Sequence, residues 1–433
     1  MNRPVDGKAP TISGDNSPFN RSARRDAKHT AILSEAARLF NTKGSRGTTL
    51  HDIADSLGLT KSSLYHYVKT KEELIYQCYM ATIDGHNSAL DAVDHAGGTA
   101  LRRLSAFYMQ HIDDWLSAQR EQGPHTAALL EIASLKDQHR DQVQGRYTAF
   151  FKRLRQTVRD GIAEGSVRDC EATSATRAFL GSLPAWSLSW LHRVPLDDVP
   201  EFSKQALDIV LHGLHANPAT FVPSPLVLDN TSSKQPRGFL SREEDSRQKQ
   251  AAFTSAGTVF FNRKGFKSTS LDEISEYLNV SKGAFYYYIK NKEDLLYNCY
   301  TVTLDTTAVI HDIAAENPGN GMQKVEQVCR RMFIVENSDA GPLIRFSTIT
   351  ALPNARREKV LLRIVESNHR FGNFIREGIA DGSIRAVNDF VAENLVSAAV
   401  NASMNMELWR NIDDLDAAAL DYFDIFFSGL APT

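Results

Sequence analysis

The chain of 433 residues lacks the features that mark secreted and membrane proteins. Its four cysteines show neither the density of a disulfide-rich protein nor the CxxC spacing of a metal site. No run of about eighteen apolar residues occurs, so the sequence predicts no membrane span. Residues Met1–Phe19 are polar and contain no apolar stretch of the kind found in signal peptides. We therefore expect a cytoplasmic protein with no membrane partner.

Motifs of catalysis are missing as well. The sequence contains no GxxxxGK[ST], HExxH, GxSxG or CxxC pattern, and its thirteen histidines are mostly scattered. We expect no enzymatic activity, no cofactor and no metal site. The chain has 49 basic and 52 acidic residues, a formal net charge of −3. This balance argues against binding of polyanions by the whole surface, but it is compatible with a local basic patch.

The most informative feature that is present is an internal repeat. Residues Gly44–Tyr79 align without a gap on Gly265–Tyr300, and 15 of the 36 positions are identical. Farther along, RDGIAEGSVR at Arg159–Arg168 returns as REGIADGSIR at Arg376–Arg385, with seven of ten positions identical. The repeated unit is about 200 residues long, far beyond the roughly 20 to 50 residues of a solenoid repeat. The chain therefore contains two copies of one whole module.

The hydrophobic pattern within each copy is helical. Ile32, Ala36, Leu39 and Phe40 fall on one helical face, and no segment shows a convincing alternating strand pattern. Between the copies, residues 217–246 carry four prolines among serine, threonine and charged residues, which is typical of a linker. The predicted fold class is all-α.

A pair of short helices is predicted near the start of each copy. Thr49 with Asp52, and Ser270 with Glu273, have the spacing of a capping box, and the second pair matches that motif better. A tight turn follows in both copies. Two short helices joined by such a turn form a helix-turn-helix.

The second helix of each pair has the composition of a DNA-recognition helix. Thr60 and Ser281 can act as its N-caps. Small residues at its start let the backbone approach base edges, while the tyrosines and lysines that follow can reach phosphates. Residues 20–79 contain ten basic and six acidic residues, and residues 237–300 contain ten and eight. Both regions are thus locally positive, which favours nucleic-acid binding.

Both regions resemble the DNA-binding domain of the tetracycline-repressor (TetR) family. The resemblance is carried by TTLHDIADSLGLTKSSLYHYVKTKEEL in the first copy and TSLDEISEYLNVSKGAFYYYIKNKEDL in the second. Family members are homodimeric transcription regulators, mostly repressors, that a small ligand releases from double-stranded operator DNA. The resemblance implies phosphate contacts at Thr49, Tyr65, Lys71, Ser270, Tyr286 and Lys292. It implies contacts to bases at Lys61, Ser62, Ser63, His66, Lys282, Gly283, Ala284 and Tyr287.

The resemblance also implies an order of domains. We expect a disordered basic arm over residues 1–21, a first helix-turn-helix domain over 22–80, a helical effector and interface domain over 81–216, the linker over 217–246, a second helix-turn-helix domain over 247–301 and a second helical domain over 302–433. The helices near residues 170–192 and 387–409 are the expected contact between the modules.

The duplication itself departs from the family. We expect one chain to act as an intramolecular pseudo-dimer, and pairing of two chains into a homodimer stays open. The effector is expected to be apolar or amphipathic, for instance an acyl thioester or an aromatic compound, because the helical domains are rich in Phe, Leu and Trp. The alternatives are an architectural DNA-binding protein without an effector and, less favoured, a helical acyl-transfer or hydrolytic enzyme.

Overall fold

The computed structural model of the protein describes residues 18–432, apart from 46, 130–131, 133–134, 184–193, 219–220, 227–241, 339–340 and 404–408. These residues are helical or irregular, and the one extended pairing that they contain is an isolated antiparallel bridge between His215 and Ile384. The all-α prediction is confirmed. The predicted arm lies outside the described residues up to residue 17, and the first helix begins at Pro18.

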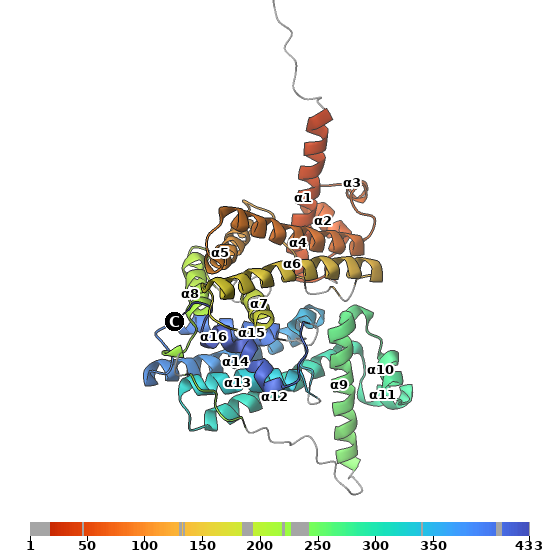
Figure 1. The fold of residues 1–433 in the computed structure, drawn as a ribbon. Helices are drawn as coiled ribbons and strands as arrows, with labels where there is room; N and C mark the ends of the chain where they lie inside the picture. Colours follow the sequence, from red (N-terminus) through yellow and green to blue (C-terminus); the bar gives the residue numbers. More distant parts are fainter. Residues whose placement is uncertain are drawn as a thin grey trace, which may run out of the picture.

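The helices form two sets in the order of the sequence repeat. The first set is α1 (Pro18–Lys43), α2 (Leu50–Ser56), α3 (Lys61–Tyr65), α4 (Lys71–Ala96), α5 (Ala100–Gln119), α6 (Asp137–Glu164), α7 (Ala172–Ser182) and α8 (Val199–His212). The second set is α9 (Arg242–Ser268), α10 (Leu271–Tyr277), α11 (Lys282–Tyr288), α12 (Lys292–Glu316), α13 (Gly321–Glu336), the 3-10 helix η4 (Phe346–Ala351), α14 (Asn354–Asp381), α15 (Asp389–Ala402) and α16 (Leu415–Phe427). Figure 1 shows the first set above the second.

The long helix that follows each helix-turn-helix, α4 or α12, forms two ion pairs with an equivalent helix in each set. The ion pairs are Arg146–Asp84 and Arg153–Asp91 between α6 and α4, at 2.6 and 2.7 Å, and Arg363–Asp305 and Arg370–Asp312 between α14 and α12, at 2.6 and 2.5 Å. The aspartates are seven residues apart, so each pair shares one helical face. The sequence repeat therefore extends to the contacts between these helices.

The first part of the predicted linker is attached to the second module. Ser224 is buried, and its backbone N–H donates to Glu326 Oε1 of α13 at 3.0 Å. Arg330, on the same helix, donates to the Ser224 carbonyl at 2.7 Å and to Asp416 Oδ1 of α16 at 2.8 Å. The buried carboxylate of Glu326 and the buried guanidinium of Arg330 thus both form hydrogen bonds with the segment that joins the modules. This fixes the path of residues 221–226 across the second module.

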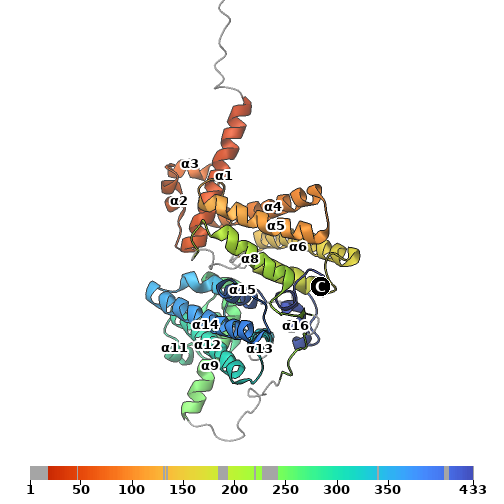
Figure 2. The same cartoon turned by 90° about the vertical axis from the view of Figure 1, so that its left-hand side faces the viewer.

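Four C-terminal helices make the largest contact between the two modules. Helices α7 and α8 of the first set contact α15 and α16 of the second, and Figure 2 shows α8 lying directly above α15 with α16 beside it. Their apolar residues belong to one buried cluster that includes Phe179 and Tyr422 and continues into both helical domains. The second helix-turn-helix has a separate cluster around Phe253 and Phe285. Of the expected contact region, residues 184–193 and 404–408 lie outside the described chain.

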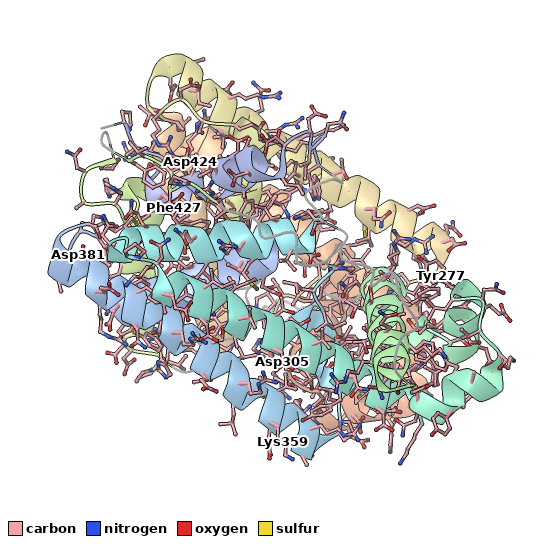
Figure 3. All side chains as sticks on the ribbon, turned by 90° about the horizontal axis from the view of Figure 1, so that it is seen from below. Tyr277, Asp305, Lys359, Asp381, Asp424 and Phe427 are labelled. Carbon is pink, nitrogen blue, oxygen red and sulfur yellow. The ribbon has the colours of Figure 1, made fainter. Side chains whose placement is uncertain are left out.

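Two arginines from the repeated RDGIAEGSVR-type motif bind across this contact in the same way. Arg168 Nε donates to the Gly429 carbonyl at 2.6 Å and pairs with Asp424 at 2.5 Å. Its counterpart Arg385 donates to the Gly213 carbonyl and pairs with Asp208, each at 2.6 Å. In Figure 3, Asp424 lies at the end of the molecule opposite Tyr277 of α10, so this contact is remote from the second helix-turn-helix. The two halves of the contact are related by a pseudo-twofold operation.

The glycines that receive these bonds have no room for a side chain. Gly213 and Gly429 have φ values of 71° and 80°, and the backbone of each touches that of the other module. A Cβ at Gly213 would overlap the Phe427 carbonyl oxygen, and one at Gly429 would overlap the Leu211 carbonyl oxygen. The close approach of the two chains therefore requires glycine at both positions.

Gly213→Ala is expected to weaken the contact between the modules. Left-handed strain and backbone overlap together should lower the free energy of unfolding by about 3 to 5 kcal/mol. Gly97→Ala is the matched control, since Gly97 has nearly the same backbone conformation (φ 71° and ψ −166°, against φ 71° and ψ −177° at Gly213) and nothing within 4 Å of an added Cβ. The control should cost about 1 to 3 kcal/mol, the backbone strain alone. Chemical denaturation monitored by circular dichroism measures both, and equal losses would contradict the close approach.

Candidate DNA interface

The first short helix of each predicted helix-turn-helix is capped, but not in the same way. Thr49 Oγ1 accepts from the Asp52 N–H at 3.1 Å, and the Thr49 N–H donates to Asp52 Oδ2 at 2.7 Å, so the predicted capping box is confirmed. The expectation that the second copy matches the motif better is wrong. Ser270 accepts from the N–H of Asp272 at 3.2 Å, and the Glu273 carboxylate pairs with Lys264 of α9 at 3.2 Å instead.

The recognition helices α3 and α11 begin at the predicted caps. Thr60 Oγ1 accepts from the Ser63 N–H, and Ser281 Oγ accepts from the Ala284 N–H, each at 3.2 Å. The buried Leu64 anchors α3 to the core, and the buried Phe285 does so for α11. Of the other residues in these two helices, Ser63 and Tyr288 are half-buried and the rest are exposed.

The structure leaves most of the residues expected to contact DNA on the surface. Exposed in the first copy are Thr49, Lys61, Ser62, Tyr65 and His66, and in the second Lys282, Gly283, Ala284, Tyr286 and Tyr287. Ser63 is half-buried, and its hydroxyl lies 2.9 Å from Thr60 Oγ1. Tyr287 is 81% exposed, which is unusual for so large an aromatic side chain. Figure 1 shows α3 and α11 on the same side of the molecule, away from its C-terminus.

Lys71 and Lys292 hold the turn that precedes the first short helix. Lys71 Nζ donates to the carbonyls of Ser45 and Thr48 at 2.8 and 3.2 Å. Lys292 Nζ donates to the Thr269 carbonyl at 2.8 Å and lies 4.7 Å above the ring of Phe266. These bonds tie the start of the long helix to the turn before α2 or α10. The sequence showed the repeated lysine but not this internal role.

The surroundings of the recognition helices differ in charge. In the second copy, Lys282 Nζ pairs with Asp272 Oδ2 at 2.6 Å, and Tyr286 Oη donates to Asp272 Oδ1 at 3.4 Å. In the first copy, Lys61 Nζ lies 5.7 Å from the centroid of the Tyr65 ring. The equivalent lysines therefore have different partners.

The described residues contain neither a cluster suited to a metal ion nor a thiol suited to act as a nucleophile. They contain no group of three or more His, Cys, Asp or Glu side chains arranged to hold a metal ion. All four cysteines are free thiols, and burial raises the pKa of Cys78 and of Cys299 to about 12. Such thiols stay protonated and are poor nucleophiles. None of the helices in the described part of the chain combines the length and apolar character that a membrane crossing needs.

Lys71→Ala should affect stability as well as DNA binding. Loss of the ammonium leaves the Ser45 and Thr48 carbonyls without this donor, so the free energy of unfolding should fall by about 1 to 2 kcal/mol. Operator affinity should weaken on all sequences, because the turn before α2 is no longer fixed. Lys69→Ala removes the same charge from an exposed side chain and serves as the control. Thermal melts and DNA titrations measure the two effects, and equal melts for both variants would show that the turn does not depend on Lys71.

Comparison with known proteins finds TetR-type sequences in both modules. The family model described as "Bacterial regulatory proteins, tetR family" matches residues 32–78 and 253–298. The model described as "Tetracyclin repressor-like, C-terminal domain" matches residues 97–214. Each of the two DNA-binding matches contains one of the helix-turn-helix pairs described above.

The curated relatives are about half as long as this chain. The HTH-type transcriptional repressor KstR2 of Mycolicibacterium smegmatis is 25% identical over 201 residues, which are 46% of this chain and 93% of that protein. KstR2 of Rhodococcus jostii is 27% identical over 202 residues, 46% of this chain and 96% of its own. The solved structure of the ketosteroid transcriptional regulator KstR2 of Mycobacterium tuberculosis is 24% identical and covers 42% of this chain and 92% of its own, with a TM-score of 0.36. Each of the two KstR2 sequences from Mycolicibacterium smegmatis and Rhodococcus jostii therefore corresponds in length to one module.

Proposed function

Because the chain belongs to the tetracycline-repressor family and carries two of its modules in tandem, we propose that it is a transcriptional repressor that binds operator DNA as a covalent pseudo-dimer. The observation that carries this proposal is the contact between the modules. Arg168 and Arg385 each bind the backbone of the other module through equivalent bonds. The surfaces that two chains would need for pairing through these helices are thus already used within one chain.

The two helix-turn-helix domains supply the proposed contacts to DNA. Thr49, Tyr65 and Lys71 would hold phosphates in one half-site, and Ser270, Tyr286 and Lys292 would hold them in the other. Base edges would be read by Lys61, Ser62, Ser63 and His66 in the first, and by Lys282, Gly283, Ala284 and Tyr287 in the second. The exposure of α3 and α11 on one side of the molecule supports this assignment (Figure 1). Phosphate contacts set the register, while base contacts set the sequence preference.

The number of chains on a minimal operator tests the pseudo-dimer. We expect one chain per site by analytical ultracentrifugation of the DNA complex, on half-sites roughly 34 to 36 Å apart. The operator is first obtained by selecting bound fragments from the source genome. Two chains on every minimal site would contradict the pseudo-dimer. Equal affinity for operator and random DNA at fixed salt would instead favour an architectural role.

We further propose that a small apolar effector enters the first helical domain between α4, α5 and α6. The rings of His86 on α4 and His111 on α5 lie 5.1 Å apart, and Phe150 of α6 lies 5.5 Å from His86. Burial lowers the pKa of His86 to about 4 and that of His111 to about 3, so both rings are neutral near pH 7. His111 Nε2 has no hydrogen-bond partner among the described residues. A polar group on an apolar ligand would supply one.

The space available in this domain indicates how a ligand would act. A recess lined in part by Leu90, Phe107 and Leu154 lies one helical turn from the histidines and is too small to hold a water molecule. Sites for drug-sized ligands measure roughly 300 to 1,000 Å³, so the three helices would have to separate. Helix α4 begins at the helix-turn-helix, and its displacement would move α3 relative to α11. An acyl thioester or an aromatic compound has the required apolar character and hydrogen-bonding group.

His111→Phe should separate effector binding from DNA binding. The variant keeps an aromatic ring but removes Nε2, so the concentration of effector needed to release operator DNA should rise about tenfold. Operator affinity without effector should stay unchanged. His311→Phe is the control: it removes a buried Nε2 that also lacks a partner among the described residues, but it lies on α12 of the second module, outside the proposed site, and should leave the effector response unchanged. Fluorescence anisotropy with a panel of acyl thioesters and aromatic acids measures the response, and a panel without effect on operator affinity would contradict the switch.

A further inference from the structure

The two helix-turn-helix domains differ at one aligned position beside the recognition helix. Position 51 of the first copy corresponds to position 272 of the second, and the residues are His51 and Asp272. His51 Nε2 lies 3.3 Å from Asp55 Oδ2, one turn along the same helix. Asp272 instead turns toward α11. The same place in the scaffold thus carries an imidazole in one module and a carboxylate in the other.

Asp272 binds two of the side chains assigned to DNA. Its Oδ2 lies 2.6 Å from Lys282 Nζ, and its Oδ1 accepts from Tyr286 Oη at 3.4 Å. A lysine and a tyrosine converging on two oxygens of one anion is the arrangement that a DNA phosphate would require of them. In the first module, Lys61 Nζ has no ion-pair partner in the described part of the chain.

We propose that Asp272 is an internal phosphate mimic that weakens the second helix-turn-helix relative to the first. The inference rests on the proposed DNA binding and assigns unequal roles to its two half-sites. The first domain presents Lys61 and Tyr65 to DNA directly. In the second domain, Lys282 and Tyr286 must give up their contacts with Asp272 before they can bind DNA. The charge of Asp272 also repels an approaching phosphate.

The charges of the two regions also indicate that the second attracts DNA less strongly than the first. Residues 20–79 carry ten basic and six acidic residues, whereas residues 237–300 carry ten and eight. The hydrogen bond from Lys282 lowers the pKa of Asp272, so the carboxylate stays ionised at neutral pH. A lysine that is already neutralised by a carboxylate adds no net charge when it meets a phosphate. It should therefore contribute little to the release of counterions on binding.

The consequence is a chain that is anchored on DNA by its first module. A homodimer has two equal DNA-binding domains, whereas here the first half-site would supply more of the electrostatic affinity. The second would contribute mainly through the shape and base contacts of Gly283, Ala284 and Tyr287. Such a chain would bind its operator in one orientation.

Asp272→Asn tests the inference directly. The variant keeps the size of the side chain and removes its charge, so Tyr286 becomes available to phosphate, and the freed Lys282, assigned above to base edges, can also reach one. Operator affinity at low salt should rise roughly tenfold, and the slope of log affinity against log salt should steepen by about 0.9. Glu273→Gln is the matched control, because it removes the same charge from the next residue, whose partner is Lys264 on α9. Thermal melts check that each variant is folded. If Asp272→Asn is not folded, Asp272→Ser replaces it as the test variant.

A double-mutant cycle distinguishes masking from a general effect of charge. Lys282→Ala should weaken wild-type binding by less than about twofold, yet it should cancel most of the gain in the Asp272→Asn background. His51→Asp should weaken binding by introducing the same carboxylate into the first module. If Asp272→Asn and Glu273→Gln change affinity and salt slope equally, the inference is overturned. The same titrations can be made on random duplex DNA, so this test does not require a selected operator. Failure to select any operator would count against the proposed function but not against the role of Asp272.

Discussion

The arrangement of this molecule depends on two reciprocal contacts in which Arg168 and Arg385 each bind the backbone of the other module. Each guanidinium donates to a glycine carbonyl and pairs with an aspartate, so its charge and several of its donors are used at once. Both arginines end the same repeated motif. Duplication of the module therefore supplied both surfaces of the contact. This contact places the two DNA-binding domains on one side of the molecule (Figure 1).

The helix-turn-helix domains share their internal framework and differ at their surface. Lys71 and Lys292 hold equivalent turns, and Leu64 and Phe285 anchor equivalent helices. Several outward residues differ, such as Ser62 and Ser63 against Gly283 and Ala284. A homodimer must change both half-sites together, but a tandem chain can change one. The carboxylate of Asp272 is the clearest result of that freedom.

Helices α4 and α12 connect the helix-turn-helix domains to the helical domains. Each begins at a helix-turn-helix, and two ion pairs join α4 to α6 and α12 to α14. Exposed pairs of this kind contribute little stability, and they serve here to keep two helices in one alignment. Within the described parts of the two helical domains, the buried His111 and His311 each have a ring nitrogen without a hydrogen-bond partner. Buried polar atoms are nearly always hydrogen-bonded, so these two nitrogens are exceptions in the interior.

The duplication could be read from the alignment of the chain with itself. The helical class, the positions of both helix-turn-helix motifs and the caps at Thr49, Thr60 and Ser281 could be predicted as well, because they depend on local spacing and on hydrogen bonds within a few residues. The sequence also predicted which residues of α3 and α11 contact DNA, and most of these are exposed in the structure. It misjudged the cap at Ser270, since the competing bond from Lys264 to Glu273 comes from another helix. The tertiary structure alone decided that Lys71 holds a turn, that Asp272 faces Lys282 and that Arg168 reaches Gly429. These contacts join residues 10 to 261 positions apart, and no local pattern records which distant partner folding will bring within hydrogen-bond distance.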